Sequence, residues 1–204
     1  YTKGSWVLHM LRSSLGTDLF RQVVKTYLER HRHGNVVTDN LRAVIEELSG
    51  KSYDRFFDQY VYHAHHPELK VDYSWDAKTK LAKLSVKQEQ KVDDKVMLFH
   101  LKLPVSFKVG KKTVLRSVEI SKVSEDYYFA LPTVPEIVRV DPDLTLLAKI
   151  TFAPPASMLH AQLLDLEDVV GRLLAVEQLA KKKDAGTVEK LKIALNEDPF
   201  HGVR

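Results

Sequence analysis

The sequence predicts a multidomain α+β chain in which a helical segment, a β-rich segment and a second helical segment follow one another. Apolar residues recur at helical spacing from Lys3 to Val61, and they alternate with polar residues after His66-Pro67. Helical spacing returns after Ala153-Pro154-Pro155, where two prolines exclude a central strand and a helix interior. We therefore place the predicted domains at residues 1–66, 67–153 and 154–204.

The first segment predicts four short helices that form a compact layer. The first helix is expected to stop at Gly16, and the second, which Thr17 can cap, at Gly34-Asn35. Thr38 is the expected cap of the third helix and Ser52 that of the fourth. The apolar stripes comprise Trp6, Val7, Met10 and Leu11, then Leu19, Phe20, Val23, Val24, Tyr27 and Leu28, then Leu41, Val44, Ile45 and Leu48, and finally Phe56, Phe57 and Tyr60.

The middle segment predicts a small β-sandwich, because short strands alternate with turn signals. A turn is expected from Asp76 to Lys80, and a hairpin turn at Val109-Gly110-Lys111-Lys112. Pro104 is expected to end the strand that begins at Phe99. The expected strands carry Leu69, Val71, Tyr73 and Trp75, then Leu84 and Val86, then Phe99, Leu101 and Leu103, then Val105 to Phe107, Val114 to Val118, Tyr128 to Leu131 and Ile137 to Val140.

The last segment predicts the start of a helical, HEAT-like repeat domain. One amphipathic stripe runs from Val169 to Leu179, and a shorter one runs from Leu191 to Leu195. Asp198-Pro199 has the pattern of an N-cap followed by proline in the first helical turn. The run from Asp168 to Arg172 loosely resembles the run from Asp198 to Arg204, as stacked helical pairs would require.

The composition is that of a globular protein. Apolar residues make up 44% of the chain and charged residues 28%, which does not predict disorder. No apolar run reaches the roughly 18 residues of a membrane-spanning helix, and we expect a soluble protein, with the cytoplasm as the favoured compartment. The absence of cysteine excludes disulfides and thiolate metal sites. The net charge of +4 comes from scattered basic residues, so nucleic-acid binding is not expected.

The candidate catalytic residue is Tyr1, although its type and position alone give little reason to choose it. A phenol that precedes a helix is usually structural or exposed, and with a pKa of about 10 it donates hydrogen bonds at neutral pH. The opening run, however, resembles a known motif, the Y-x-K-G-x-x-V-L-x-M-L-R segment of the gluzincin aminopeptidases, the family of aminopeptidase N. The run is Tyr1-Thr2-Lys3-Gly4-Ser5-Trp6-Val7-Leu8-His9-Met10-Leu11-Arg12, followed by Leu15-Gly16.

The resemblance continues in order over about the first 75 residues. The further matches are Phe20-Arg21, Tyr27-Leu28, Val37 to Leu41, Phe56 to Gln59, Val61-Tyr62 and Pro67 to Leu69. It implies that residues 1–66 are the C-terminal helical part of a catalytic peptidase domain, followed by a β-sandwich and a helical domain. It also implies a zinc metallopeptidase, a hydrolase that removes N-terminal amino acids from peptide substrates. The Tyr1 hydroxyl would then donate a hydrogen bond to the oxyanion that forms when zinc-activated water attacks the scissile carbonyl.

No zinc ligand is predicted within these residues. The family's H-E-x-x-H helix, its distal glutamate ligand and its glycine-rich substrate motif are missing, and the resemblance places the zinc ligands upstream. We therefore expect the isolated chain to be inactive, and we assign no metal ligand and no cofactor-binding residue. Imidazoles gather at His31-Arg32-His33 and His63-Ala64-His65-His66, where chance clustering is the simpler interpretation. His65 departs from the family, in which glycine is usual at this bend.

Two other classes of protein stay open at this point. A non-catalytic relative would keep the architecture as an interaction scaffold, as in one subunit of the general transcription machinery, although the retention of Tyr1 favours the enzyme. A helical-repeat binding module joined to a sandwich would explain the last segment but not the opening run. Lys3 is either a residue that positions Tyr1 or a solvated lysine.

Overall fold

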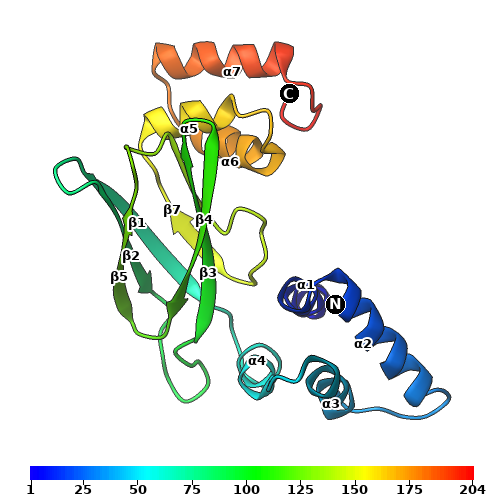
Figure 1. The fold of residues 1–204 in the computed structure, drawn as a ribbon. Coiled ribbons are helices and arrows are strands. Elements are labelled where there is room, and N and C mark those ends of the chain that lie inside the picture. Colours follow the sequence, from blue (N-terminus) through cyan, green and yellow to red (C-terminus); the bar gives the residue numbers. More distant parts are fainter. The chain divides into compact units, whose positions relative to one another are not determined.

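The computed structural model describes residues 1–204, in which helices come first, strands follow and helices return (Figure 1). Contacts divide the chain into two compact units. The first unit comprises Tyr1–Pro67, Gln90–Phe99 and Thr145–Lys149, and the second comprises Glu68–Glu89, His100–Leu144 and Ile150–Arg204. The predicted mixture of helix and strand is confirmed, whereas the assignment of three separate domains stays a prediction.

Helices make up most of the first unit. They are α1 (Thr2–Leu15), α2 (Thr17–Arg30), α3 (Thr38–Ser49), α4 (Asp54–Phe57) and the π-helix η1 (Asp58–Tyr62). As predicted, α1 stops at Gly16, whose φ of 80° lies in the left-handed region that favours glycine. Gly50 ends α3 in the same region, with a φ of 65°. The four predicted helices are therefore present, and the fourth continues as a π-helix.

The predicted caps of these helices are wrong by about one residue. Thr17 and Thr38 are the first residues inside their helices, and the N-cap positions belong to Gly16 and Val37. The start of α3 is held instead by Asn40, whose side-chain oxygen accepts a hydrogen bond from the Val37 amide at 2.8 Å. A side chain one turn into the helix has replaced the expected threonine cap, and spacing in the sequence does not distinguish these two arrangements.

The core of the first unit contains residues from every helix and from the inserted segment Gln90–Phe99. Leu11, Val23 and Ile45 are each 1% exposed, which confirms their predicted positions in the apolar stripes. Phe99 is fully buried and packs against the Tyr60 ring, with the ring centroids 5.9 Å apart. Phe99 therefore belongs to this core, and the prediction that a strand begins at Phe99 is wrong, because that strand begins at Leu101.

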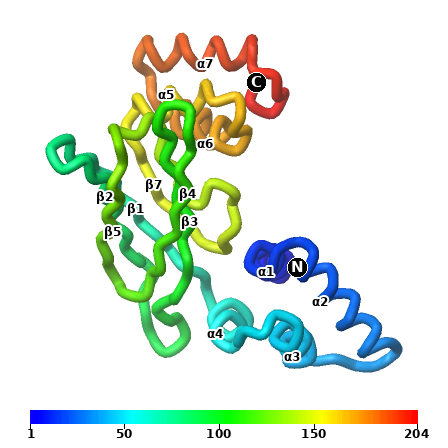
Figure 2. The backbone as a smooth tube through the Cα atoms, viewed as in Figure 1, coloured from blue at the N-terminus to red at the C-terminus, as the bar shows by residue number.

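The strands of the second unit form two small sheets. They are β1 (Glu68–Asp76), β2 (Leu81–Gln88), β3 (Leu101–Val109), β4 (Lys112–Ile120), β5 (Ser124–Ala130), β6 (Ile137–Val140) and β7 (Lys149–Phe152). The sheet orders are β5-β2-β1-β7 and β4-β3-β6. β3 and β4 form the predicted hairpin and run side by side along their whole length (Figure 2). Phe107 of one sheet packs against Phe129 of the other, with ring centroids 4.9 Å apart.

Pro104 does not end a strand, contrary to the prediction. β3 continues through it to Val109, and Pro104 lies opposite Ser117 of β4. On its other side β3 pairs with β6, and that ladder begins only at Val105 opposite Val140. Because Pro104 lies outside this ladder, the missing amide hydrogen breaks no bond to β6, while its carbonyl still accepts from the Asp141 amide at 2.8 Å.

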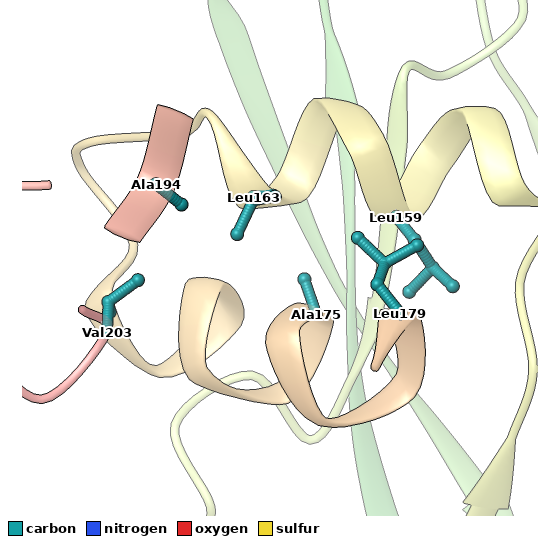
Figure 3. Packing of buried hydrophobic residues seen from close by; sticks show 6 residues of the cluster. All are labelled: Leu159, Leu163, Ala175, Leu179, Ala194 and Val203. Carbon is teal, nitrogen blue, oxygen red and sulfur yellow. The ribbon is translucent and has the colours of Figure 1, made fainter. Parts of the chain in front are cut away.

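Three helices complete the second unit. They are α5 (Ala156–Leu163), α6 (Val169–Leu179) and α7 (Ala185–Glu197). Their side chains meet in one apolar cluster, in which α5, α6, α7 and the last turn all take part (Figure 3). The cluster contains Leu159, Leu163, Ala175, Leu179, Ala194 and Val203. None of the helices in the structure is both long and apolar enough to cross a bilayer.

A buried ion pair fastens the end of this helical group. The Arg172 side chain is 1% exposed, its Nε lies 2.7 Å from Asp198 Oδ2, and its Nη1 donates to the Asp165 carbonyl at 2.8 Å. Asp198 also accepts from the Phe200 amide at 2.8 Å, as a capping aspartate does. The residues after Asp198 form turns, in which the Arg204 amide donates to the Phe200 carbonyl at 3.4 Å. Asp198 therefore makes a capping contact, and the helix start at Asp198-Pro199 stays a prediction. Asp198 also orders the turn that brings Val203 into the cluster.

Candidate functional site

Tyr1 lies at the N-terminal end of α1, where its side chain is fully exposed. Its carbonyl oxygen accepts the Ser5 amide at 3.0 Å, so the backbone of Tyr1 already belongs to the helical hydrogen-bond pattern. Its side chain makes no capping bond to the helix. The phenol therefore has no structural partner in α1 and is available to a ligand.

The outer face of α1 carries the residues that surround Tyr1. Tyr1, Thr2, Gly4, Ser5 and Leu8 line an open hollow of about 560 Å³. Tyr1, Gly4, Ser5 and Leu8 have the spacing of one helical face, since residues three and four apart are neighbours on a helix. Between Tyr1 and Leu8 this face has the small residues Gly4 and Ser5.

The first turn of α1 has a positive electrostatic character. It contains no acidic side chain, and Lys3 is its one charged residue. A group that becomes negative beside Tyr1 would therefore meet no repulsion from the helix that carries it.

Tyr60, a second tyrosine of the first unit, differs from Tyr1 because its phenol is packed in the core. Tyr60 is 3% exposed and lies among the rings of Phe56 and Phe99. Its hydroxyl is buried without a hydrogen-bond partner, and burial raises the pKa of the Tyr60 phenol. Tyr60 is thus closed to solvent, whereas Tyr1 is open to it.

No group of three or more His, Asp or Glu side chains in the structure could hold a metal ion. The histidines singled out in the sequence contact other residues: His31 packs against the Tyr27 ring, and His63 Nδ1 lies 3.1 Å from Asp58 Oδ1. The residues of this chain therefore do not fit a zinc site, and we derive no catalytic step through a metal from them.

His65 has an unusual backbone conformation. Its φ is 65°, in the left-handed region where residues other than glycine are strained by roughly 1–2 kcal/mol. This is the position at which the resembling family usually has glycine. The bend at His65 thus has a backbone conformation that glycine adopts without strain.

Comparison with solved structures shows which known fold the chain resembles. The fold matches the crystal structure of Legionella pneumophila aminopeptidase A in complex with aspartic acid, with a TM-score of 0.78. The match covers 98% of this chain and 25% of that chain, at 15% sequence identity. At this level of identity the likeness shows the fold alone, which is that of a segment of a larger aminopeptidase structure.

The sequence comparisons show a family to which the first part of the chain is similar. Residues 1–60 match the model of the peptidase family M1 domain. Aminopeptidase N of Lactococcus lactis subsp. lactis is 35% identical over 72 residues, which cover 35% of this chain and 8% of the relative. Aminopeptidase 2 of Candida albicans is 29% identical over 137 residues, which cover 64% of this chain and 15% of the relative. Residues 1–60 therefore resemble a peptidase family M1 domain, which agrees with the predicted resemblance to the gluzincin aminopeptidases. The chain spans less than a sixth of the length of these curated relatives.

Proposed function

We propose that this chain is part of a zinc aminopeptidase that removes N-terminal amino acids from peptides. The observation that carries the proposal is the combination of the family M1 match over residues 1–60 with the exposure of Tyr1 at the start of α1. Tyr1 is the first residue of the motif that matches the family. Its hydroxyl has no structural task in this unit, and it lies beside a hollow that can admit a peptide.

In this proposal Tyr1 supplies a hydrogen bond to the reacting carbonyl. The carbonyl oxygen of the scissile bond gains negative charge as the bond is attacked, and the phenol donates its hydrogen to that oxygen. This hydrogen bond from Tyr1 is stronger in the transition state than in the bound substrate, because the negative charge on the accepting oxygen has grown. The positive first turn of α1 supports the same charge. Donors of this kind lower the barrier by about 2.7–4 kcal/mol.

The metal belongs to a part of the protein outside these residues. The proposed domain order follows from the same resemblance: residues 1–66 end the catalytic domain, residues 67–153 form a β-sandwich and residues 154–204 begin a HEAT-like helical domain. Peptides are the proposed partners, because the hollow beside Tyr1 is the accessible face of the matching segment.

The proposal is tested by zinc content and peptidase activity in two proteins. We expect the full-length protein to contain one tightly bound zinc and to hydrolyse an aminoacyl p-nitroanilide. We expect residues 1–204 alone to bind no stoichiometric zinc and to hydrolyse nothing, with far-UV circular dichroism to check that they fold. A full-length protein without zinc or hydrolysis would overturn the proposal and favour the non-catalytic scaffold. Tight one-to-one zinc binding by residues 1–204 would overturn the assignment of the metal to another part.

A further inference from the structure

The two sides of α1 have different tasks. The buried residues of the helix are Val7, Met10 and Leu11, which pack into the core of the first unit. Lys3 precedes Val7 by four residues and therefore lies on this packed side. Tyr1 lies on the other side, because residues two apart on a helix are separated by about 200°. Lys3 is thus directed away from the hollow that Tyr1 lines.

Lys3 makes a specific contact on the packed side. Its Nζ donates a hydrogen bond to the carbonyl oxygen of His63 at 3.1 Å, across 60 residues of sequence. His63 is the C-terminal cap of η1, where carbonyl groups lack helical partners and carry partial negative charge. Local helix energetics do not explain this lysine, since a cation in the first turn is unfavourable to the α1 dipole. The contact with His63 does explain it.

The acceptor of this hydrogen bond is itself held in place. The His63 amide donates to the Asp58 carbonyl at 3.0 Å, and the His63 imidazole lies 3.1 Å from the Asp58 carboxylate. The carbonyl that Lys3 reaches is therefore part of an ordered helix end. A hydrogen bond to the His63 carbonyl can therefore fix the position of Lys3.

A second contact fastens the opposite end of α1 to the same segment. Ser14 Oγ lies 3.1 Å from the Tyr53 hydroxyl, and Tyr53 immediately precedes α4. Lys3 and Ser14 are about 16 Å apart along the helix axis, at a rise of 1.5 Å per residue. The segment from Tyr53 to His63 therefore holds α1 near both ends. The Ser14 contact is remote from Tyr1, whereas the Lys3 contact is two residues away from it.

We propose that Lys3 is the positioning residue for Tyr1. It fixes the first turn of α1 to the end of η1, and so holds the phenol at the height and angle that the reacting carbonyl requires. This inference rests on the proposed function of Tyr1. Lys3 is exposed and makes one hydrogen bond, so its contribution to the free energy of unfolding is small. Its contribution to the rate is larger, because a donor displaced by a fraction of an ångström no longer meets the oxyanion.

The test uses the full-length protein with Lys3→Met, Lys3→Arg and a matched control. We expect Lys3→Met to lower kcat on the order of tenfold, with KM and the melting temperature nearly unchanged, since the loss arises in the transition state. Lys3→Arg keeps a donor and should recover most of the rate. Lys25→Met is the control, because Lys25 is an exposed lysine of α2 that is paired only with Glu29 of the same helix, at 3.9 Å. It should leave kcat unchanged.

A double-variant cycle with Tyr1→Phe separates the possible outcomes. If Lys3 acts through Tyr1, then Lys3→Met should have no further effect once the Tyr1 hydroxyl has been removed. Losses that multiply in the double variant, a wild-type kcat for Lys3→Met, or a loss that follows the melting temperature would each overturn the role of Lys3. A wild-type kcat for Tyr1→Phe would instead overturn the proposed function itself, so the two failures are distinguishable.

Discussion

The first turns of α1 and α6 have the same spacing of N-cap residue and glycine, but these residues make different contacts. Each has an N-cap residue followed three positions later by glycine, as Tyr1 and Gly4 in α1 and as Asp168 and Gly171 in α6. Asp168 accepts the Gly171 amide at 2.7 Å and pairs with Arg139, whereas Tyr1 makes no capping bond. A Cβ at Gly171 would overlap Arg139 Nη1 and the Asp168 carboxylate, whereas a Cβ at Gly4 would meet nothing within 4 Å.

This difference indicates that the start of α6 is stabilised by side-chain contacts and the start of α1 is not. In α6 the cap, the glycine and the ion pairs all serve the packing of the second unit. In α1 the cap position has a residue that cannot cap, and the glycine sits where no neighbour requires it. Local rules are broken in this way at functional sites, where a residue is kept for its chemistry at some loss of stability. The comparison predicts that substitutions in the first turn of α6 lower the stability, whereas the loss of the Tyr1 hydroxyl at the start of α1 lowers the rate of the proposed reaction.

The largest expected effect on stability comes from removing the buried cation of α6. Arg172→Met leaves the Asp198 carboxylate, which is 3% exposed, buried without its counter-charge. We expect the free energy of unfolding of the second unit to fall by about 3–5 kcal/mol, measured by urea denaturation. Lys102→Met is the control, because the pair of Lys102 and Glu119 is 73% and 78% exposed and contributes at most about 1 kcal/mol. Equal losses of unfolding free energy in the two variants would contradict the stabilising role of the buried pair of Arg172 and Asp198.

A smaller effect of opposite sign in the two helices sharpens the comparison. Gly171→Ala should lower the free energy of unfolding by about 1–3 kcal/mol, because the new methyl group overlaps the pair of Arg139 and Asp168. Gly4→Ala should raise it by up to about 1 kcal/mol, since alanine is the better helix former and the site is open. Thermal melting of both variants measures the signs. The same sign in both would remove the distinction between the two turns.

Much of the fold was predictable from the spacing of apolar residues. The stripes in the first segment and the alternation in the middle segment placed the helices and most strands, because each of those elements is covered on one face only. α5 escaped prediction because it is short. It has eight residues, and its one buried face contains Gln162 as well as Met158, Leu159 and Leu163, so the apolar stripe is brief and interrupted. The short strand β7 was not assigned separately either.

The candidate site was predictable only in part. Tyr1 was found through its motif, because neither its residue type nor its spacing distinguishes it from a surface phenol. The sequence left open whether Lys3 positions Tyr1 or is solvated. Its hydrogen bond could not be predicted, since a backbone carbonyl 60 residues away leaves no pattern in the sequence. The glycine-like conformation of His65 likewise depends on the bend and not on the residue that occupies it.

The most direct test of the account is kcat of Tyr1→Phe in the full-length protein. Phenylalanine keeps the ring and removes only the hydroxyl, so the loss should arise in the transition state and not in substrate binding. We expect kcat to fall on the order of a hundredfold or more, with KM, zinc content and melting temperature nearly unchanged. Tyr128→Phe, at an exposed tyrosine of β5, is the matched control and should leave kcat unaltered. A Tyr1→Phe variant with wild-type kcat and full zinc would contradict the account and reduce Tyr1 to a residue that flanks a helix.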